Sequence, residues 1–259
     1  MKRILLCIVC LFALTFVSSR AAIIEVAPAG AWGVLGINGG GVVAGATGQT
    51  IVDDFTSYGS AEAHLIANWQ ELSGAGATHI NTSTDVMYTD AAESFSIIYD
   101  GQATDTITQY GAVRFAGDVT FTGLYFRSDG NASNRAYALR VDGADDIQWR
   151  DCLGHSCQDV DQPTAGDGTC NPTVSVGTGT SIGFRVTGIG TNTVLEVWAW
   201  SGDPPAVTDG DVDTAWSSPD CTLTGNPDAA ANDGTYVGLY NGASDAGSFS
   251  LFRAGDSTN

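Results

Sequence analysis

Three side chains able to bind a sugar alternate along one short stretch of the chain. Between residues 193 and 200, Leu195 and Val197 alternate with Glu196, Trp198 and Trp200. Successive residues of a β-strand point to opposite faces of its sheet, so the carboxylate and the two indoles would share the face away from the core. Indole rings offer flat apolar faces on which sugar C–H groups stack, while polar side chains bind the hydroxyls. We predict a carbohydrate-binding platform made of Glu196, Trp198, Trp200, Trp149 and Arg127.

The alternative is that these tryptophans are structural. Indole side chains in strands bury large apolar areas, and they pack within a core or beneath a loop more often than they face a ligand. Trp198 and Trp200 would then belong to a second buried layer of the domain.

A run of alternating acids predicts a calcium-binding loop. Asp209, Asp211 and Asp213 alternate with other residues, and Asp220 follows the first of them by eleven positions. Carboxylate oxygens are the ligands that Ca²⁺ prefers. The run departs from an EF-hand loop, because Thr214 replaces the glycine of the sixth position and no glutamate occupies the twelfth.

The N-terminus has the organisation of a secretory signal peptide. Lys2 and Arg3 precede an apolar run from residue 4 to residue 17, and Ser19 and Ala21 provide the small side chains of a cleavage site after Ala21. We assign residues 1–21 to a signal peptide and expect a secreted or cell-surface protein. No later segment reaches eighteen apolar residues, so no membrane span is predicted in the mature chain.

The mature chain is strongly acidic. It keeps seven arginines and no lysine against 29 Asp and Glu, which gives a net charge of −22. Such a charge disfavours binding to nucleic acids and to anionic membrane surfaces. It favours solubility at high salt and the binding of divalent cations.

Four cysteines lie beyond the signal peptide: Cys152, Cys157, Cys170 and Cys221. An even number of cysteines in an exported chain indicates disulfides, and four cysteines allow three connectivities. We predict Cys152–Cys157 and Cys170–Cys221, which make one tight loop and one long staple. The alternative is a metal site that uses His155, but the spacing matches no common zinc pattern.

The mature chain divides near residue 50. Residues 22–50 are a Gly/Ala-rich, nearly uncharged arm, which would be a linker, a hairpin or a strand that pairs with a neighbouring copy. Strand signals separated by turn residues recur from there to the end, and Ala61–Leu72 is the one segment expected to be helical. The expected strands are Ile51–Phe55, Ser94–Asp100, Tyr110–Phe115, Val119–Arg127, Ala136–Asp142, Ile147–Asp151, Ser181–Thr187, Thr193–Trp200, Tyr236–Tyr240 and Ser248–Arg253.

Several of these strands resemble the concanavalin A-like lectin/glucanase superfamily in its laminin-G-like form. The similarity rests on core and turn positions over roughly residues 51–256, which include Val52–Phe55, Gly123–Arg127, Tyr137–Arg140, Ile182–Gly188 and Phe252–Asp256. It implies an all-β, two-sheet antiparallel jelly-roll sandwich for residues 51–259. First and last strands usually pair in this fold, which would bring Asp53 or Asp54 next to Asp256 as a second calcium site.

The enzymes of this superfamily are not matched by a catalytic signature. Laminarinase-like members carry Glu-x-Asp-x-x-Glu on one strand, whereas Glu196 here stands alone with Trp198 in the place of the aspartate. The three histidines are not in the Gln-x-His setting of alginate-lyase-like members. A glycoside hydrolase or polysaccharide lyase is therefore the second alternative.

The expected function is a secreted, non-catalytic module that binds carbohydrate or an extracellular surface and is stabilised by calcium. The first alternative is a structural subunit of an extracellular filament, sheath or coat. In that case residues 22–50 would add a strand to the sheet of a neighbouring copy.

Overall fold

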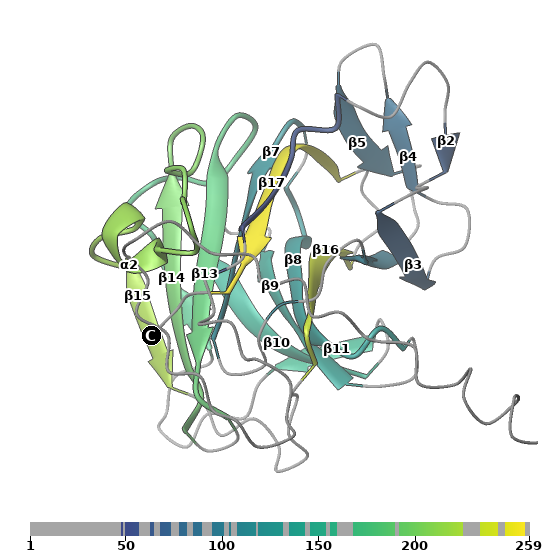
Figure 1. Cartoon of the computed structure of the whole chain (residues 1–259). Helices are drawn as coiled ribbons and strands as arrows, with labels where there is room; N and C mark the ends of the chain where they lie inside the picture. Colours follow the sequence, from purple (N-terminus) through teal and green to yellow (C-terminus); the bar gives the residue numbers. More distant parts are fainter. Residues whose placement is uncertain are drawn as a thin grey trace, which may run out of the picture. The chain divides into compact units, whose positions relative to one another are not determined.

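Two antiparallel β-sheets make up the domain (Figure 1). The computed structural model describes Gly48 and residues 50–56, 63–64, 68–73, 78–81, 85–89, 95–100, 104, 108–117, 119–131, 135–142, 146–153, 156–159, 168–189, 192–224, 234–242 and 247–256. These residues belong to one unit, residues 46–259. The predicted signal peptide and nearly all of the arm lie outside the described residues. The predicted fold class, an all-β sandwich of two antiparallel sheets, is confirmed.

Sheet A contains nine of the described strands. In spatial order they are β15 (Cys221–Thr224), β14 (Val194–Trp200), β13 (Ser181–Thr187), β7 (Gln109–Phe115), β17 (Ser248–Gly255), β5 (Val86–Thr89), β4 (Thr78–Asn81) and β2 (Ala63–His64), with β1 (Thr50–Asp53) also pairing β17. The pairing of β1 with β17 confirms that the first and last expected strands meet.

Sheet B contains eight of the described strands. In spatial order they are β11 (Ser156–Asp159), β10 (Ile147–Leu153), β9 (Arg135–Val141), β8 (Thr122–Ser128), β16 (Tyr236–Asn241), β6 (Phe95–Tyr99) and β3 (Trp69–Ser73), with β12 (Thr169–Cys170) also pairing β10. All ten expected strands are present in the two sheets.

Apolar side chains at alternate strand positions fill the space between the sheets. Leu124 and Phe126 of β8 belong to the same buried cluster as Phe184 and Val186 of β13. The rings of Phe126 and Phe184 stack with their centroids 4.1 Å apart. Burying each such side chain contributes about 1.5 to 3 kcal/mol, so this alternation is what drives the segments into strands.

A buried hydrogen bond links the two sheets near the start of the domain. Asp53 of β1 accepts from Trp69 Nε1 of β3 at 2.8 Å and from the Phe55 amide at 2.8 Å. Trp69 packs against Phe252, with ring centroids 4.9 Å apart. The expected helix at residues 61–72 is therefore wrong, because burying Trp69 between the sheets requires an extended chain and overrides the local helix propensity.

Both predicted disulfides are present. Cys152–Cys157 closes the β10–β11 hairpin, in which the two cysteines are cross-strand partners. Cys170–Cys221 joins β12 of sheet B to β15 of sheet A. The described part of the chain contains no helix long and apolar enough to cross a bilayer.

Candidate functional site

Three residues of the predicted platform, Glu196, Trp198 and Trp200, lie on the outer face of sheet A, and another part of the same chain covers them. Residues 202–220, here called the strap, run from the end of β14 to the start of β15 and include the short helix α2 (Val212–Ala215). Trp198 is only 4% exposed, because it packs in a cluster with Trp216 and Val212 of the strap. Trp200 stays half-buried beside it.

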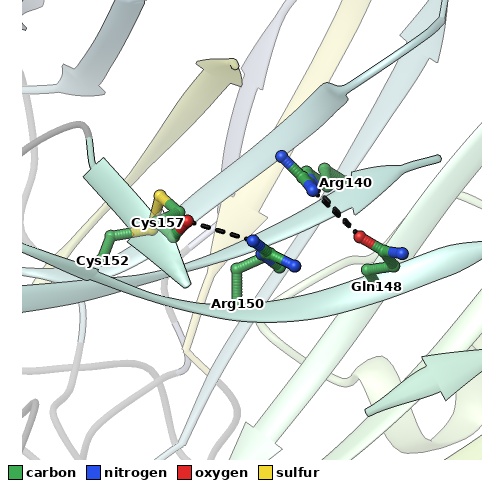
Figure 2. The surroundings of a disulfide bond; sticks show 5 residues. All are labelled: Arg140, Gln148, Arg150, Cys152 and Cys157. Carbon is green, nitrogen blue, oxygen red and sulfur yellow. Dashed lines mark hydrogen bonds between the residues drawn. A yellow bond between two sulfur atoms is a disulfide. The ribbon is translucent and has the colours of Figure 1, made fainter. Parts of the chain in front are cut away.

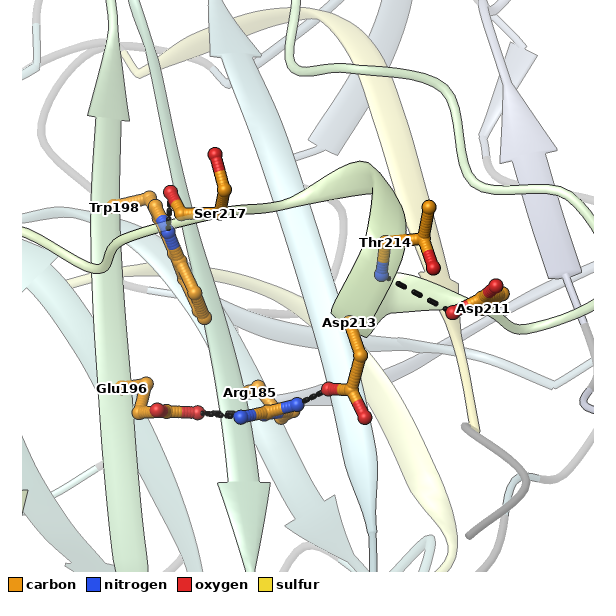
Figure 3. Close-up of polar contacts among 7 residues, drawn as sticks. All are labelled: Arg185, Glu196, Trp198, Asp211, Asp213, Thr214 and Ser217. Atoms are coloured by element: carbon orange, nitrogen blue, oxygen red, sulfur yellow. Dashed lines mark hydrogen bonds and ion pairs between the residues drawn. The ribbon is translucent and has the colours of Figure 1, made fainter.

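The indole N–H groups of this cluster are used within the protein. Trp198 Nε1 donates to the Ser217 carbonyl at 3.2 Å (Figure 3), and Trp216 Nε1 donates to the Pro205 carbonyl at 3.0 Å. The Trp216 ring lies 5.4 Å from that of Trp198 and 5.1 Å from that of Trp200. The tryptophans therefore fasten the strap to sheet A, which is the structural alternative rather than an open platform.

Glu196 is engaged in an ion-pair chain on the same face. Arg185 of β13 donates to Glu196 Oε2 at 2.6 Å from its Nε, and its other side reaches Asp213 of the strap (Figure 3). The carboxylate thus contributes to holding the strap and is not oriented toward an open surface.

The other two platform residues lie elsewhere, and that part of the prediction is corrected. Trp149 belongs to sheet B and is fully buried between the sheets, where it packs edge-on against Tyr137 at 5.3 Å. Arg127, also fully buried, donates to the Gly188 carbonyl, and its amide donates to Gln109 Oε1 at 3.0 Å. Both residues belong to sheet B, whereas Glu196, Trp198 and Trp200 lie on the outer face of sheet A, so the five residues do not form one platform.

The aspartates of the predicted calcium loop are not brought together. Asp211 caps α2 through the Thr214 amide, Asp213 pairs with Arg185, and Asp220 accepts from the Ala199 amide at 2.8 Å. Among the described residues, no three acid, cysteine or histidine side chains form a metal-binding group. Calcium binding itself stays a prediction, which thermal unfolding with and without EDTA would test.

The second predicted calcium pair is separated by the strand register. Thr50 pairs with Gly255 and Asp53 with Phe252 in the antiparallel β1–β17 ladder. Asp54 and Asp256 therefore lie beyond opposite ends of that ladder, at a separation of roughly 15 Å for a rise of about 3.3 Å per residue. Asp54 instead accepts hydrogen bonds from the amide and hydroxyl of Thr56.

The outer face of sheet B carries a set of large polar side chains that the sequence reasoning did not single out. The strand register places them in two rows. The first row is Gln148, Arg140, Gly123 and Tyr240, and the second is Arg150, Ala138, Tyr125 and Gly238. We call Arg140, Gln148, Arg150, Tyr125 and Tyr240 the arginine–tyrosine face.

Small residues lie between the large side chains of this face. Gly123 separates Arg140 from Tyr240 across the sheet, and a Cβ at this position would clash with the Leu139 carbonyl oxygen. Ala138 lies between Arg150 and Tyr125 in the same manner. Gly123 and Ala138 therefore leave space between the long side chains of neighbouring strands.

Arg140 and Gln148 are held by each other (Figure 2). Gln148 Oε1 accepts from Arg140 Nη2 at 3.1 Å and from its Nε at 3.3 Å, and the Gln148 amide donates to Asp142 Oδ2 at 2.5 Å. The Arg140 guanidinium also lies 4.7 Å over the ring of Phe121. Both side chains are half-buried, so they are fixed and still reach the surface.

Arg150 is oriented by the disulfide hairpin. Its Nη2 donates to the Cys157 carbonyl at 3.1 Å (Figure 2). Burial lowers the pKa of Arg150 from its usual value, and the neighbouring Arg140 charge lowers it further. An arginine remains charged at neutral pH in any such setting, so the face holds two guanidinium charges near each other.

The two tyrosines form the buried floor. Tyr125 and Tyr240 are 1% and 2% exposed, and their rings stack at 6.3 Å. Burial raises the pKa of both phenols, while a hydrogen bond and the charge of Arg140 act in the opposite direction on Tyr240. The hydroxyl of Tyr240 therefore stays protonated at neutral pH and supports the Arg140 guanidinium from below.

A sequence signal for this face does exist. Arg140, Gln148 and Arg150 alternate with the buried residues Leu139, Val141, Ile147 and Trp149. Alternation predicts that the three polar side chains share one face. The sequence alone does not show that β9 pairs with β10 and β8 with β16. This pairing places the three polar side chains beside the tyrosines.

Comparison with known proteins gives likenesses of structure alone. No family model and no curated protein matches the chain. It is similar to the carbohydrate-binding module CBM66 from Bacillus subtilis (12% identity, TM-score 0.41, 73% of this chain and 92% of the module covered). It is also similar to the exoplasmic/lumenal domain of VIP36 in its Ca²⁺/Man-bound form (14%, 0.42, 79% and 88%) and to a xylan beta-1,4-xylosidase from Bacillus halodurans C-125 (11%, 0.43, 78% and 38%). Likenesses at this level carry no argument about ligand or activity.

Proposed function

We propose that the domain is a non-catalytic module that acts outside the cell and binds glycans through the arginine–tyrosine face of sheet B. The observation that carries the proposal is the placement of Arg140, Gln148 and Arg150. These three half-buried polar side chains share one face, and each is held by a hydrogen bond to the protein.

Fixed planar groups suit the recognition of sugars. Guanidinium and amide groups present donors and acceptors in a plane, and neighbouring sugar hydroxyls can bind two of them at once. Because Arg140 and Gln148 already restrain each other, little further side-chain entropy is lost when a ligand binds. A ligand would contact these groups above the tyrosine floor.

The composition of the face supports binding rather than hydrolysis. Glycoside hydrolysis requires two carboxyl groups that flank the scissile bond. None of the five side chains of the face is a carboxylate, and Asp142 beside them accepts a hydrogen bond from Gln148.

Two features support a location outside the cell. The disulfides Cys152–Cys157 and Cys170–Cys221 are of the kind that persists in oxidising compartments. The predicted signal peptide, residues 1–21, gives the route of export.

A glycan array with the mature protein tests the proposal. For any glycan bound, Gln148→Ala should weaken binding about tenfold, because it removes hydrogen bonds to the ligand and releases Arg140. Trp200→Ala is the matched control, since Trp200 lies on the other sheet in the position first expected to bind sugar.

The outcomes separate the alternatives. If Trp200→Ala weakens binding and Gln148→Ala does not, the assignment to sheet B is wrong. If the mature protein binds no glycan, the function itself is wrong. Release of shortened or unsaturated sugars from a panel of polysaccharides would contradict the non-catalytic assignment and favour the hydrolase or lyase alternative.

A further inference from the structure

Two like charges lie next to each other on the arginine–tyrosine face. Arg140 pairs with Gln148 across the β9–β10 ladder, so Arg150 is its diagonal neighbour on the same face. Diagonal neighbours in a sheet are about 7 to 8 Å apart, and the charge of Arg140 lowers the pKa of Arg150, which indicates repulsion between the two guanidinium groups. A mature chain with seven arginines and 29 acids therefore places two of its few cations next to each other.

The arginine–tyrosine face holds two of the seven arginines of the acidic mature chain. Asp142 is the carboxylate whose charge acts on Arg150, and it accepts a hydrogen bond from Gln148. The charges of Asp129 and Asp151 act on Tyr125 of the same face, and Asp151 is itself paired with Arg135. Repulsion from the rest of the surface is screened beyond about 8 Å at physiological salt, so the charges within that distance of Arg140 and Arg150 have the largest effect on ligand binding.

Neutral sugars are the poorer fit to this face. Their recognition relies on stacking against open aromatic rings, but Tyr125 and Tyr240 are 1% and 2% exposed. Of the five residues of this face, Arg140, Gln148 and Arg150 are the three that are half-buried. A guanidinium has five N–H donors, and the Gln148 carbonyl accepts from two nitrogens of Arg140. The other N–H donors of the Arg140 guanidinium suit a charged acceptor with two oxygens.

We propose that the ligand of the arginine–tyrosine face is an anionic glycan, whose uronate carboxylate or sulfate ester is bound between Arg140 and Arg150. This inference rests on the proposed glycan-binding function and specifies its ligand class. The planar guanidinium fork binds carboxylate or sulfate oxygens in charge-assisted pairs. Binding of the anion relieves the repulsion between the two arginines, which favours an anionic ligand over a neutral one.

Isothermal titration with matched polymers tests the ligand class. The probes are polygalacturonate against its fully methyl-esterified form, and dextran sulfate against dextran, each at about 0.15 M and 0.5 M salt. The charged member of at least one pair should bind at least tenfold more tightly than its neutral partner, and the pair that shows this distinguishes carboxylate from sulfate.

Two substitutions test the residues. Arg140→Gln and Arg150→Gln should each weaken binding of the charged polymer by about 10- to 100-fold, because each removes a charge-assisted hydrogen bond. Arg114→Gln is the matched control, since Arg114 lies on sheet A and pairs with the exposed Asp203 of the strap. Arg150→Lys keeps the charge but not the fork, so it should bind with intermediate affinity. Circular dichroism checks that each variant is folded.

Each outcome supports or overturns the inference. Equal binding of charged and neutral polymers, with loss in the Arg140 and Arg150 variants, leaves the proposed function standing and contradicts the ligand class. Duplex DNA serves as a further probe. If it binds as tightly as the charged polysaccharide, the face binds polyanions in general, and the assignment to an anionic glycan is contradicted as well. An equal loss in Arg114→Gln shows that net charge rather than this face is responsible. If the protein binds none of these polymers and no glycan on the array, the proposed function itself is contradicted, and not only the ligand class.

Discussion

Tyr110 connects β1, sheet A and the strap through one phenol. Its ring packs edge-on against Trp216 at 5.5 Å, and its hydroxyl lies 3.3 Å from Thr50 Oγ1. Burial raises the pKa of Tyr110 to about 12, although the hydrogen bond with Thr50 acts in the opposite direction. The folded protein therefore keeps this proton at a pH where the unfolded chain has lost it.

Alkaline pH should destabilise the domain in a way that depends on Tyr110. A phenol in the unfolded chain ionises near pH 10. Its contribution to stability is complete below pH 10 and is lost as the pH rises toward about 12, because the unfolded state then gains by releasing the proton. Denaturant unfolding at pH 8, 10 and 11 should show a smaller alkaline loss of stability for Tyr110→Phe than for the wild type. An identical loss in both proteins would show that Tyr110 does not stay protonated.

At the residue scale, the sequence predicted the orientation of side chains better than their accessibility. Alternation placed Glu196, Trp198 and Trp200 on the face opposite Leu195 and Val197, and the structure agrees. It could not show that the strap covers this face, because a covering segment with no regular pattern leaves no periodic signal. Both disulfides were predicted, since four cysteines permit few pairings and the short Cys152–Cys157 loop suits a hairpin.

At the element scale, the strap has two attachments of unequal strength. The ion pair of Asp213 with Arg185 has side chains 51% and 22% exposed. Exposed pairs of this kind contribute about 0 to 1 kcal/mol. Trp216, which is 3% exposed, packs against three aromatic rings of sheet A. The apolar attachment should therefore dominate.

Substitutions in the strap should reflect this difference. Trp216→Ala should lower the free energy of unfolding by about 3 to 5 kcal/mol, as for other buried large-to-small changes, and should weaken the near-ultraviolet dichroism of the indoles. Asp213→Asn should lower it by no more than about 1 kcal/mol. Denaturant unfolding measures both. A larger effect of Asp213→Asn than of Trp216→Ala would show that charge rather than packing holds the strap.

Elements with a clear period were predicted, and those without one were not. The ten expected strands all exist because each buries an alternating set of apolar side chains. Strands β4 and β15 were missed, since both are short and have little apolar content, and α2 is too short to show a helical period. The candidate site was missed because it depends on the register of four strands, which local sequence does not encode.

At the scale of the whole molecule, Cys170–Cys221 and the Asp53–Trp69 hydrogen bond each connect sheet A with sheet B. Gly48 precedes β1 of sheet A, and a Cβ at this position would lie 2.7 Å from the Gly210 Cα of the strap. Gly210 also donates to Thr50 Oγ1 at 3.2 Å. The start of β1 is thus fixed against the strap.

Self-association through residues 22–50 stays a prediction, and β1 is the place to test it. Among the described strands, β1 pairs only with β17, and its Val52 is 54% exposed. An exposed strand edge is a template for a strand from another copy. If the arm adds to such an edge, multi-angle light scattering of the mature protein should show oligomers, and removal of residues 22–47 should give a monomer. Val52→Lys should also reduce assembly, because a lysine on an edge strand blocks further pairing. A mature protein that is already monomeric would exclude the filament or coat alternative and leave glycan binding as the function to pursue.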